Sequence, residues 1–338
     1  MHRLVLKLYM STLVQLKGND MWDVKFKRKE HYNCFQNVIY SMSEFYQTTH
    51  YMMMLELWGF RYVKDEEGPI GNRLSLPWLG QVDRRGILLE KYHGFGFKVH
   101  PRKEFACRVK AALQESPVGF YLDCFWCEWT NYYQIQHREH LVLCLAEDDE
   151  NYICIDDTCE EDKNIYLDKK FVELHCKNYV TFHKADINND ISNSITIINE
   201  ISSLIHYMEE TDTFSQYENF VDDMVNELDI PEELEDKTNP VSARLFMFMK
   251  NIADDRYNFA EALGYIGQEA GLDFAKSKKI LLDISYRYEK IRAYLIRCYF
   301  LSKKQDINVV NKEFTTILQL EKEIYEDLKS LSGKEYDN

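Results

Sequence analysis

The stretch HLVLCLAEDDENYICIDD, residues 140–157, contains two short apolar runs separated by a polar segment. The first run covers 140–146 and the second 151–157, and the residues between them have the composition of a turn. This pattern predicts a β-hairpin. Just upstream, VGFYLDCFW (118–126) is aromatic and β-prone, so we expect a further strand there.

On both sides of the hairpin, short apolar runs and helical periodicities alternate. Further strands are expected at 96–100, 164–168 and 179–185. Helices are expected near 84–93 and 103–114. Strands that follow one another across short turns pair antiparallel, so this part of the chain is expected to be α+β with an antiparallel sheet.

Residues 186–194, DINNDISNS, have the composition of a linker, and the sequence beyond them is helical. The clearest case is 274–302, where one apolar stripe recurs at the helical period. We therefore expect two domains: an α+β domain at 1–186 and an all-α helical domain at 195–338.

Composition limits the classes of protein that need consideration. The chain has 338 residues, 45% of them hydrophobic, and a net charge of −15, which disfavours nucleic acid as a partner. No run of eighteen apolar residues occurs, so no membrane span is expected, and the first residues do not resemble a signal peptide. Nine irregularly spaced cysteines favour a reducing, cytoplasmic location. The pair Cys124 and Cys127 is expected to be core thiols rather than a metal site.

The charge is divided unevenly along the chain. Residues 1–110 hold 18 Lys and Arg against 11 Asp and Glu, whereas residues 111–338 hold 23 against 45. Within the first part, KFKRKEH (25–31) gathers four basic side chains just before Cys34. The segment is either a solvated loop or a landing site for an acidic or phosphate-bearing partner.

Cys34 begins a run, CFQNVIYSMSEFY, whose apolar residues recur at the helical period. A cysteine at a helix start is either a small buried hydrophobe or a nucleophile favoured by the helix dipole. A nucleophile needs a base and a group that orients the base. If the hairpin turn is centred on Asp148, His140 and Asp156 face each other on one side of the sheet and Asp157 points to the other, unless a bulge intervenes. The alternative is an ordinary strand-edge pair at the surface.

The chain resembles a known family in these regions. The N-terminal domain of the butirosin biosynthesis protein H family is similar, and so, more distantly, are the papain-like bacteriocin-processing cysteine peptidases. The residues that carry the resemblance are HYNCFQNVIY at 31–40, WGFRY at 58–62 and the segment 117–157. The resemblance implies a papain-like catalytic domain followed by a helical domain.

The activity implied by the resemblance is acyl transfer through a cysteine. An acyl or peptidyl group would pass from the phosphopantetheine thioester of a carrier protein to an amine acceptor, forming an amide in specialised-metabolite or antibiotic biosynthesis. Cys34 would be the nucleophile, His140 the general base and then acid, and Asp156 the residue that orients it. No bound cofactor or metal is implied, because the carrier protein delivers the phosphopantetheine arm.

Several other residues receive expected roles. The related peptidases have a Gln six residues before the nucleophile, but this chain has Arg28, so Asn33 or Asn37 is the candidate second oxyanion donor. Asp123, Tyr133 and His137 match positions of the family. Asp123 must be hydrogen-bonded if it is buried. The remaining expectations are these: Tyr133, His137 and Trp126 contact the substrate, and Lys25, Lys27, Arg28 and Lys29 bind the carrier, with Arg84, Arg85, Arg102 and Lys103 as the next candidates.

Two alternatives remain open from the sequence. A cysteine peptidase, amidase or thioester hydrolase would use the same triad and release a free acid. A non-catalytic binding module would keep the fold without needing the thiol.

Overall fold

The structure is a computed structural model that describes residues 21–64, 67–75, 82–103, 105–159, 163–234 and 240–332. The chain divides into two compact units. The sheet unit comprises Met1–Lys27 and Val99–His183, and the helical unit comprises Arg28–Lys98 and Lys184–Asn338. Each unit is thus assembled from two segments that are separated in the sequence.

The two units cut across the linear division expected from the sequence. Residues 28–98 belong to the helical unit because their side chains pack on its long helices. Trp58, for example, stacks on Phe259 at a ring-centroid distance of 5.6 Å, and the Tyr62 hydroxyl donates to Asp223. The division into domains at 1–186 and 195–338 stays a prediction. The two compact units divide the chain differently, because residues 28–98 join the helical unit.

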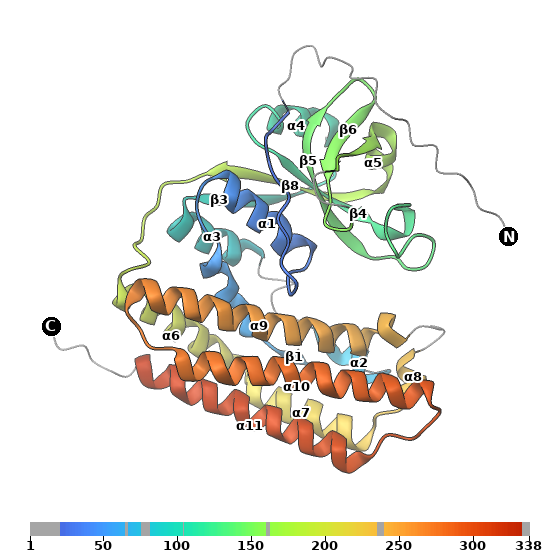
Figure 1. Cartoon of the computed structure of the whole chain (residues 1–338), viewed down its shortest axis with the longest axis vertical. Helices are drawn as coiled ribbons and strands as arrows, with labels where there is room; N and C mark the ends of the chain where they lie inside the picture. Colours follow the sequence, from blue (N-terminus) through green and yellow to red (C-terminus); the bar gives the residue numbers. More distant parts are fainter. Residues whose placement is uncertain are drawn as a thin grey trace. The chain divides into compact units, whose positions relative to one another are not determined.

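The structure confirms a mixed α+β chain with an antiparallel sheet (Figure 1). Six strands form one sheet in the order β3-β8-β4-β5-β6-β7, and every pairing from β8 to β7 is antiparallel. The strands are β3 (Phe95–Pro101), β4 (Val118–Asp123), β5 (Glu139–Glu147), β6 (Asn151–Ile155), β7 (Ile165–Asp168) and β8 (Cys176–Lys184). A separate two-stranded sheet pairs β1 (Arg61–Tyr62) with β2 (Leu74–Ser75).

The predicted hairpin is present, but its predicted register is wrong. Next to the turn, Glu147 pairs with Tyr152. A turn centred on Asp148 would instead have paired Glu147 with Asp149. An irregularity between Cys144 and Ala146 then shifts the register by one residue, so that Cys144 pairs with Cys154. A β-bulge adds one residue to one strand, and here the extra residue lies in β5.

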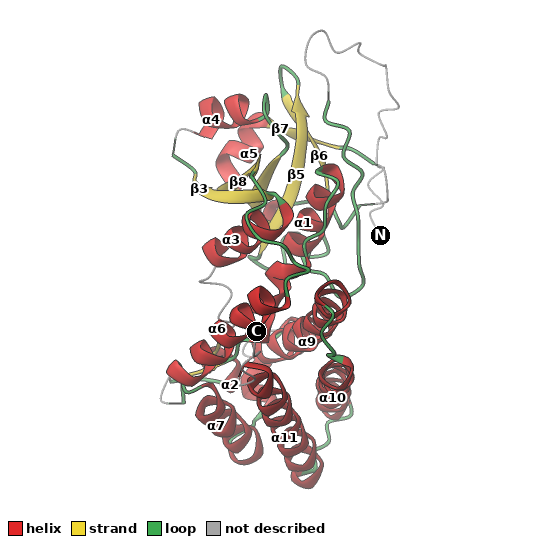
Figure 2. Ribbon diagram, turned by 90° about the vertical axis from the view of Figure 1, so that its left-hand side faces the viewer, coloured by secondary structure: helices red, strands yellow, loops and turns green. Residues whose placement is uncertain are grey.

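The core of the sheet unit lies between strands and two short helices, α4 (Phe105–Ala112) and α5 (Lys169–His175) (Figure 2). Phe120 and Val142 from the strands and Val109 and Val172 from the helices belong to one buried cluster. Cys124 and Cys127 are buried thiols in the core, as expected. They lie at the end of β4, in and after a 3-10 turn (η3, Cys124–Trp126), rather than in a strand.

The helical unit begins with α1 (Cys34–Phe45), so the predicted helix start at Cys34 is confirmed. The predicted helix near 84–93 and the predicted long helix near 274–302 are also present, and residues 186–193 form the predicted irregular linker. The helices of this unit are η1 (Tyr51–Trp58), α2 (Ile70–Arg73), α3 (Val82–His93), α6 (Ser194–Glu210), α7 (Thr213–Asn226), α8 (Ile230–Leu234), η4 (Pro240–Ser242), α9 (Arg244–Ala270), α10 (Ala275–Phe300) and α11 (Ile307–Ser332).

One glycine determines where α9 stops. Gly271 follows the helix with φ of 67° and ψ of 27°, a left-handed conformation that glycine adopts without the penalty paid by other residues. Its N–H donates to the Gly267 carbonyl. The chain can therefore reverse and begin α10 within a few residues.

A buried ion pair ties three parts of the helical unit together. Arg256 of α9 donates through Nε to Glu321 of α11 at 2.7 Å, and both side chains are fully enclosed. Trp58 Nε1 and the Tyr217 hydroxyl also donate to the Glu321 carboxylate, while Arg256 reaches the carbonyl of Leu57. A buried charge with this many donors is compensated, so the cluster fixes η1 against the helices.

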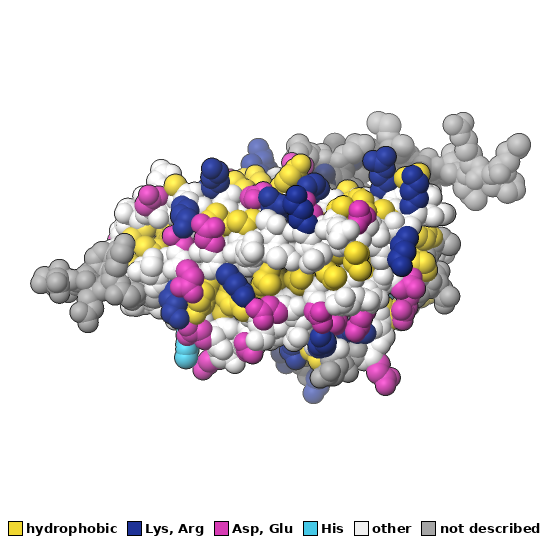
Figure 3. All heavy atoms as spheres, turned by 90° about the horizontal axis from the view of Figure 1, so that it is seen from below, with side chains coloured by type: hydrophobic (Ala, Val, Ile, Leu, Met, Phe, Trp, Pro, Cys, Tyr) yellow, Lys and Arg dark blue, Asp and Glu magenta, His cyan; other side chains and the backbone are white. Residues whose placement is uncertain are grey.

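In the described part of the chain, no helix is both long and apolar enough to cross a membrane. Figure 3 shows one face of the molecule, on which acidic, basic and apolar side chains are interspersed. The strong negative charge of residues 111–338 is therefore not gathered into a single acidic surface on that face.

Candidate active site

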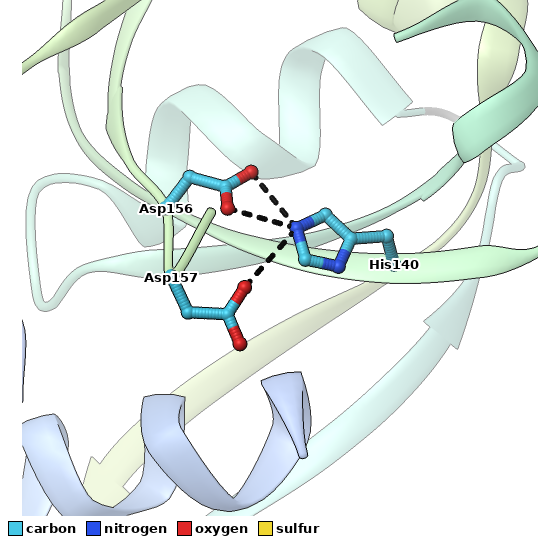
Figure 4. A group of neighbouring side chains, drawn as sticks. All are labelled: His140, Asp156 and Asp157. Atoms are coloured by element: carbon cyan, nitrogen blue, oxygen red, sulfur yellow. Dashed lines mark hydrogen bonds and ion pairs between the residues drawn. The ribbon is translucent and has the colours of Figure 1, made fainter. Parts of the chain in front are cut away.

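His140 and Asp156 form an enclosed His–Asp pair in the sheet unit. His140 is the second residue of β5 and Asp156 follows the last residue of β6, and they are 7% and 3% exposed. His140 Nε2 lies 2.9 Å from Oδ1 and 2.8 Å from Oδ2 of Asp156 (Figure 4). The predicted contact is therefore present, although Asp156 reaches His140 from beyond the strand end rather than as a paired residue.

Other donors hold the Asp156 carboxylate in place. Trp129 Nε1 donates to Oδ2 at 2.8 Å, and the backbone N–H and hydroxyl of Thr158 donate to Oδ1 at 2.7 and 2.8 Å. Burial alone would raise the pKa of the Asp156 carboxyl, but hydrogen bonds and charge from His140, with those from Thr158 and Trp129, outweigh it and lower the pKa. Asp156 is therefore an ionised, immobilised acceptor.

Asp157 also faces His140, contrary to the expectation that it points to the other side of the sheet. Its Oδ1 lies 3.6 Å from His140 Nε2, and Figure 4 shows both carboxylates directed toward the same ring nitrogen. The reason is local. The alternation of a strand ends with β6 at Ile155, so residues 156 and 157 no longer point to opposite faces.

These three residues could also hold a metal ion, because one ligand atom from each lies within 4.8 Å of the others. The hydrogen bonds of Asp156 favour the orientation of His140 over metal binding. Both of its oxygens already accept from Trp129 or Thr158 in addition to His140. A metal would have to compete with these donors, whereas orienting a histidine uses them as they stand.

A second His–Asp pair lies at the same end of the sheet. His137 Nδ1 is 2.7 Å from Asp123 Oδ2, and the His137 ring stacks on Phe125 at 4.3 Å. The Asp123 carboxylate also accepts from the Phe125 N–H, so the expectation that it is hydrogen-bonded is confirmed. This pair is open to solvent, with 64% of the His137 side chain exposed.

Cys34 belongs to the helical unit, where it is the first residue of α1. Asn33 caps the helix, since its side chain accepts from the Gln36 N–H while the Gln36 side chain accepts from the Asn33 N–H. This reciprocal arrangement is a capping box. Cys34 is a partly exposed free thiol, unlike six of the other cysteines, which are buried.

The segment before Cys34 is held by hydrogen bonds. The Lys29 N–H donates to Asn37 Oδ1 at 3.1 Å, and Asn37 Nδ2 donates to the Tyr32 carbonyl at 3.4 Å. From α9, Asn258 donates to the His31 carbonyl at 2.8 Å. Of the two candidate oxyanion donors, Asn37 thus has its amide engaged with this loop, and Asn33 uses its side-chain oxygen as the helix cap.

The basic segment does not present four equivalent cations. Lys25 and Arg28 are exposed, whereas Lys27 and Lys29 are half-buried, and Lys29 lies against aromatic rings. Lys29 Nζ donates to the Tyr51 hydroxyl at 2.9 Å. It also lies about 5 Å from the ring centres of three tyrosines, Tyr32, Tyr40 and Tyr51. Lys29 therefore holds the loop against these tyrosines, and its charge is less accessible than those of Lys25 and Arg28.

Two other residues expected to contact the substrate, Trp126 and Tyr133, make their described contacts with residues other than His140. Trp126 is 42% exposed and stacks on His175, and the Tyr133 hydroxyl donates to Glu128 at 3.4 Å. Among the next carrier-binding candidates, Arg85 is buried against the Phe35 ring. Arg84 pairs with Glu56, whereas Arg102 is exposed.

Sequence reasoning missed the partners of Asp156. Thr158 had a signal, because an aspartate commonly accepts from the N–H two residues later. Trp129 had none, since its indole reaches Asp156 across 27 positions of the chain. In comparisons with known proteins, no protein-family model matches this sequence, and no curated protein matches it.

Proposed function

We propose that this protein is a cysteine acyltransferase that takes an acyl or peptidyl group from a carrier-protein thioester and passes it to an amine. The observation that carries the proposal is the enclosed His140–Asp156 pair, whose carboxylate is fixed by Trp129 and Thr158. A histidine held in this way is suited to moving protons for a nucleophile. The capped helix start that presents a partly exposed Cys34 supports the choice of nucleophile.

The proposed reaction has two steps. Cys34 Sγ attacks the thioester carbonyl, and His140 first accepts the thiol proton and then gives it to the departing pantetheine sulfur. The acceptor amine next attacks the acyl-enzyme carbonyl, its proton passes to His140, and the Cys34 sulfur leaves with a proton from His140. Asp156 orients the imidazole and stabilises its charged form in both steps.

The proposal includes a papain-like arrangement and a cytoplasmic role in specialised metabolism, for which the resemblance of residues 31–157 to the butirosin biosynthesis protein H family is the support. It requires Cys34 to meet His140 in the working protein. A short bifunctional alkylating reagent tests this requirement. It should link the Cys34 and His140 peptides in the wild type, and the link should be absent from Cys34→Ser.

Acyl transfer itself is tested by intact mass spectrometry of the protein mixed with acyl-loaded carrier proteins. The wild type should gain the mass of one acyl group and lose it when an amine is added. Cys34→Ser should gain nothing, while Cys107→Ser, which removes an exposed thiol elsewhere, should behave as the wild type. Acylation that survives in Cys34→Ser contradicts the proposal. Release of free acid instead of an amide identifies a thioester hydrolase.

A further inference from the structure

An open depression of about 350 Å³ lies in the sheet unit, at the end of β4 and the start of β8. It is not part of the proposed chemistry. Asp123, which lines it, pairs in register with Glu139, the residue before His140. The lining residues are Arg102, Asp123, Trp126, Leu174, His175, Cys176 and Lys177.

His175 is fixed in the wall of this depression. Its ring stacks on Trp126 at 4.8 Å and contacts the Phe171 ring at 4.9 Å, so two aromatic side chains hold the imidazole. Burial lowers the pKa of His175, with a further contribution from the charge of Arg102 and an opposing one from Asp123. Among the described residues, no side chain or backbone group hydrogen-bonds to this ring. The imidazole therefore offers both a donor and an acceptor to a ligand.

Two cations line the same depression as the imidazole. Arg102 is exposed and uses one nitrogen to donate to the Leu174 carbonyl at 3.1 Å, which anchors the side chain while other N–H groups of the guanidinium remain for a ligand. Lys177 is 3.5 Å from Glu139, but both side chains are about half exposed, and such surface pairs contribute little. A ligand anion can displace Glu139 at small cost.

The one carboxylate in the wall is already compensated. Asp123 accepts from His137 at 2.7 Å and from the Phe125 N–H at 3.2 Å. Partial burial opposes ionisation, yet the His137 hydrogen bond, the Phe125 N–H and the charge of Lys177 lower the pKa of Asp123. The carboxylate is therefore directed toward His137, so it opposes an anion less than an unpaired carboxylate would.

Trp126 supplies an apolar surface beside the cations. Its side chain is 42% exposed although it is large and aromatic, and it stacks on His175 rather than on the core. An exposed indole next to a guanidinium and an ammonium is the combination that binds a flat ring carrying an anionic group.

We infer that this depression binds a small phosphate ester that carries a planar ring. The phosphate lies between Arg102, Lys177 and His175, and the ring stacks on the indole of Trp126. A phosphate is favoured over a carboxylate because two cations and an imidazole match a dianion with three oxygens better than a monoanion with two. The site stands independently of the proposed acyl transfer.

Calorimetric titration of the full chain with four probes tests the inference: adenosine monophosphate, ribose phosphate, adenosine and benzoate. Adenosine monophosphate should bind with a one-to-one stoichiometry. Ribose phosphate should bind roughly tenfold more weakly, because it lacks the stacking ring. Adenosine and benzoate should bind more weakly still. Benzoate binding as tight as that of the nucleotide overturns the choice of phosphate, and absence of saturable binding by both phosphate esters overturns the site.

Substitutions locate the binding. Arg102→Gln and Lys177→Gln should each weaken adenosine monophosphate binding by about tenfold or more, since each removes a charge-assisted hydrogen bond. Trp126→Leu should remove the preference for the nucleotide over ribose phosphate and leave ribose phosphate binding unchanged. Lys170→Gln, an exposed lysine of α5 outside the depression, is the matched control and should bind as the wild type. Equal weakening by Lys170→Gln shows general charge attraction and overturns the assignment.

Discussion

Two His–Asp pairs of the sheet unit, both within the described residues, have opposite character. In the pair His140–Asp156, the side chains are 8% and 0% exposed, whereas in the pair His137–Asp123 they are 64% and 12% exposed. The nitrogen-to-oxygen distances are nearly the same, 2.8 and 2.7 Å. Distance alone therefore does not distinguish the two pairs.

The surroundings of the carboxylates do distinguish them. Besides the hydrogen bond with His140, the Asp156 carboxylate accepts one from Trp129 and two from Thr158. Besides the hydrogen bond with His137, the Asp123 carboxylate accepts one from the Phe125 N–H. Removal from water strengthens each of these interactions and raises the cost of losing one. Asp156 is thus held firmly enough to orient His140 as a proton carrier. The open pair, His137–Asp123, is suited to the edge of a binding surface.

The largest expected difference is in turnover, if the proposed acyl transfer is correct. His140→Gln should lower kcat by roughly a thousandfold or more, because general acid–base catalysis by a positioned histidine contributes about that much. His137→Gln should lower it only a fewfold. Single-turnover transfer from an acyl-loaded carrier protein measures both. A larger loss with His137→Gln would exchange the roles of the two pairs.

The second expected difference is in stability. Asp156→Ala should cost about 3–5 kcal/mol of unfolding free energy, because it leaves the buried His140 without its partner and the part-buried Trp129 and Thr158 donors without their acceptor. Asp123→Ala should cost about 1 kcal/mol, since water can replace its partners. Urea unfolding of both variants provides the comparison, and similar midpoints would show that the burial of Asp156 has no energetic consequence.

The third expectation concerns acid. The pKa of Asp156 is lower in the folded chain than its usual value of 3.8, so the unfolded chain takes up the proton first as the pH falls. Its contribution to stability is complete above the unfolded pKa and is lost as the pH falls below about 4. Asp156→Asn should therefore show a shallower loss of unfolding free energy between about pH 5 and pH 2.

The control for this experiment is Asp123→Asn. The pKa of Asp123 is also lowered, but its partner His137 is 64% exposed, so their interaction is screened by solvent. The pH profile of this variant should stay close to that of the wild type. If both substitutions made the pH dependence of the unfolding free energy equally shallow, the acid-sensitive part of the stability could not be assigned to His140–Asp156.

The sequence was sufficient to predict the enclosed pair but not its geometry. The hairpin follows from alternation and turn composition, which are local properties. The contact between His140 and Asp156 was expected from a register that the structure does not have, and it is made because Asp156 follows the end of β6. The register does not, because the irregularity between Cys144 and Ala146 has no residue signature in the sequence. Asp157 was placed on the wrong face for a related reason, since the end of β6 at Ile155 depends on tertiary context.

Long-range contacts explain the other differences. The basic segment before Cys34 has the composition of a set of solvated charges, but Lys29 is half-buried and contacts tyrosines, one of which lies 22 positions away. The grouping of residues 28–98 with the long helices likewise depends on side chains far apart in sequence, such as Trp58 with Glu321. Periodicity reports which face of an element is apolar, and it does not report which element covers that face.

The smallest expected difference is in the unfolding free energy lost when the hydrogen-bond donor to each carboxylate is removed, rather than the carboxylate itself. Trp129→Phe keeps an aromatic ring near Phe171 but removes the N–H that reaches Asp156. It should cost about 1.5–3 kcal/mol, the usual contribution of a hydrogen bond to a charged group. His137→Phe likewise keeps a ring on Phe125 and removes the donor to Asp123, and it should cost less than about 1 kcal/mol, because the pair is exposed.

Loss of ring size must be separated from loss of the donor. Trp126→Phe makes the same change of ring as Trp129→Phe at an exposed position whose indole stacks on His175. If Trp126→Phe and Trp129→Phe lower the unfolding free energy equally, the Trp129 hydrogen bond contributes nothing beyond packing. If Trp129→Phe alone lowers it and also raises the pH at which acid unfolding begins, the indole N–H stabilises the charged form of Asp156. That result would establish that the rigidity of the enclosed pair comes from its donors as well as from its burial.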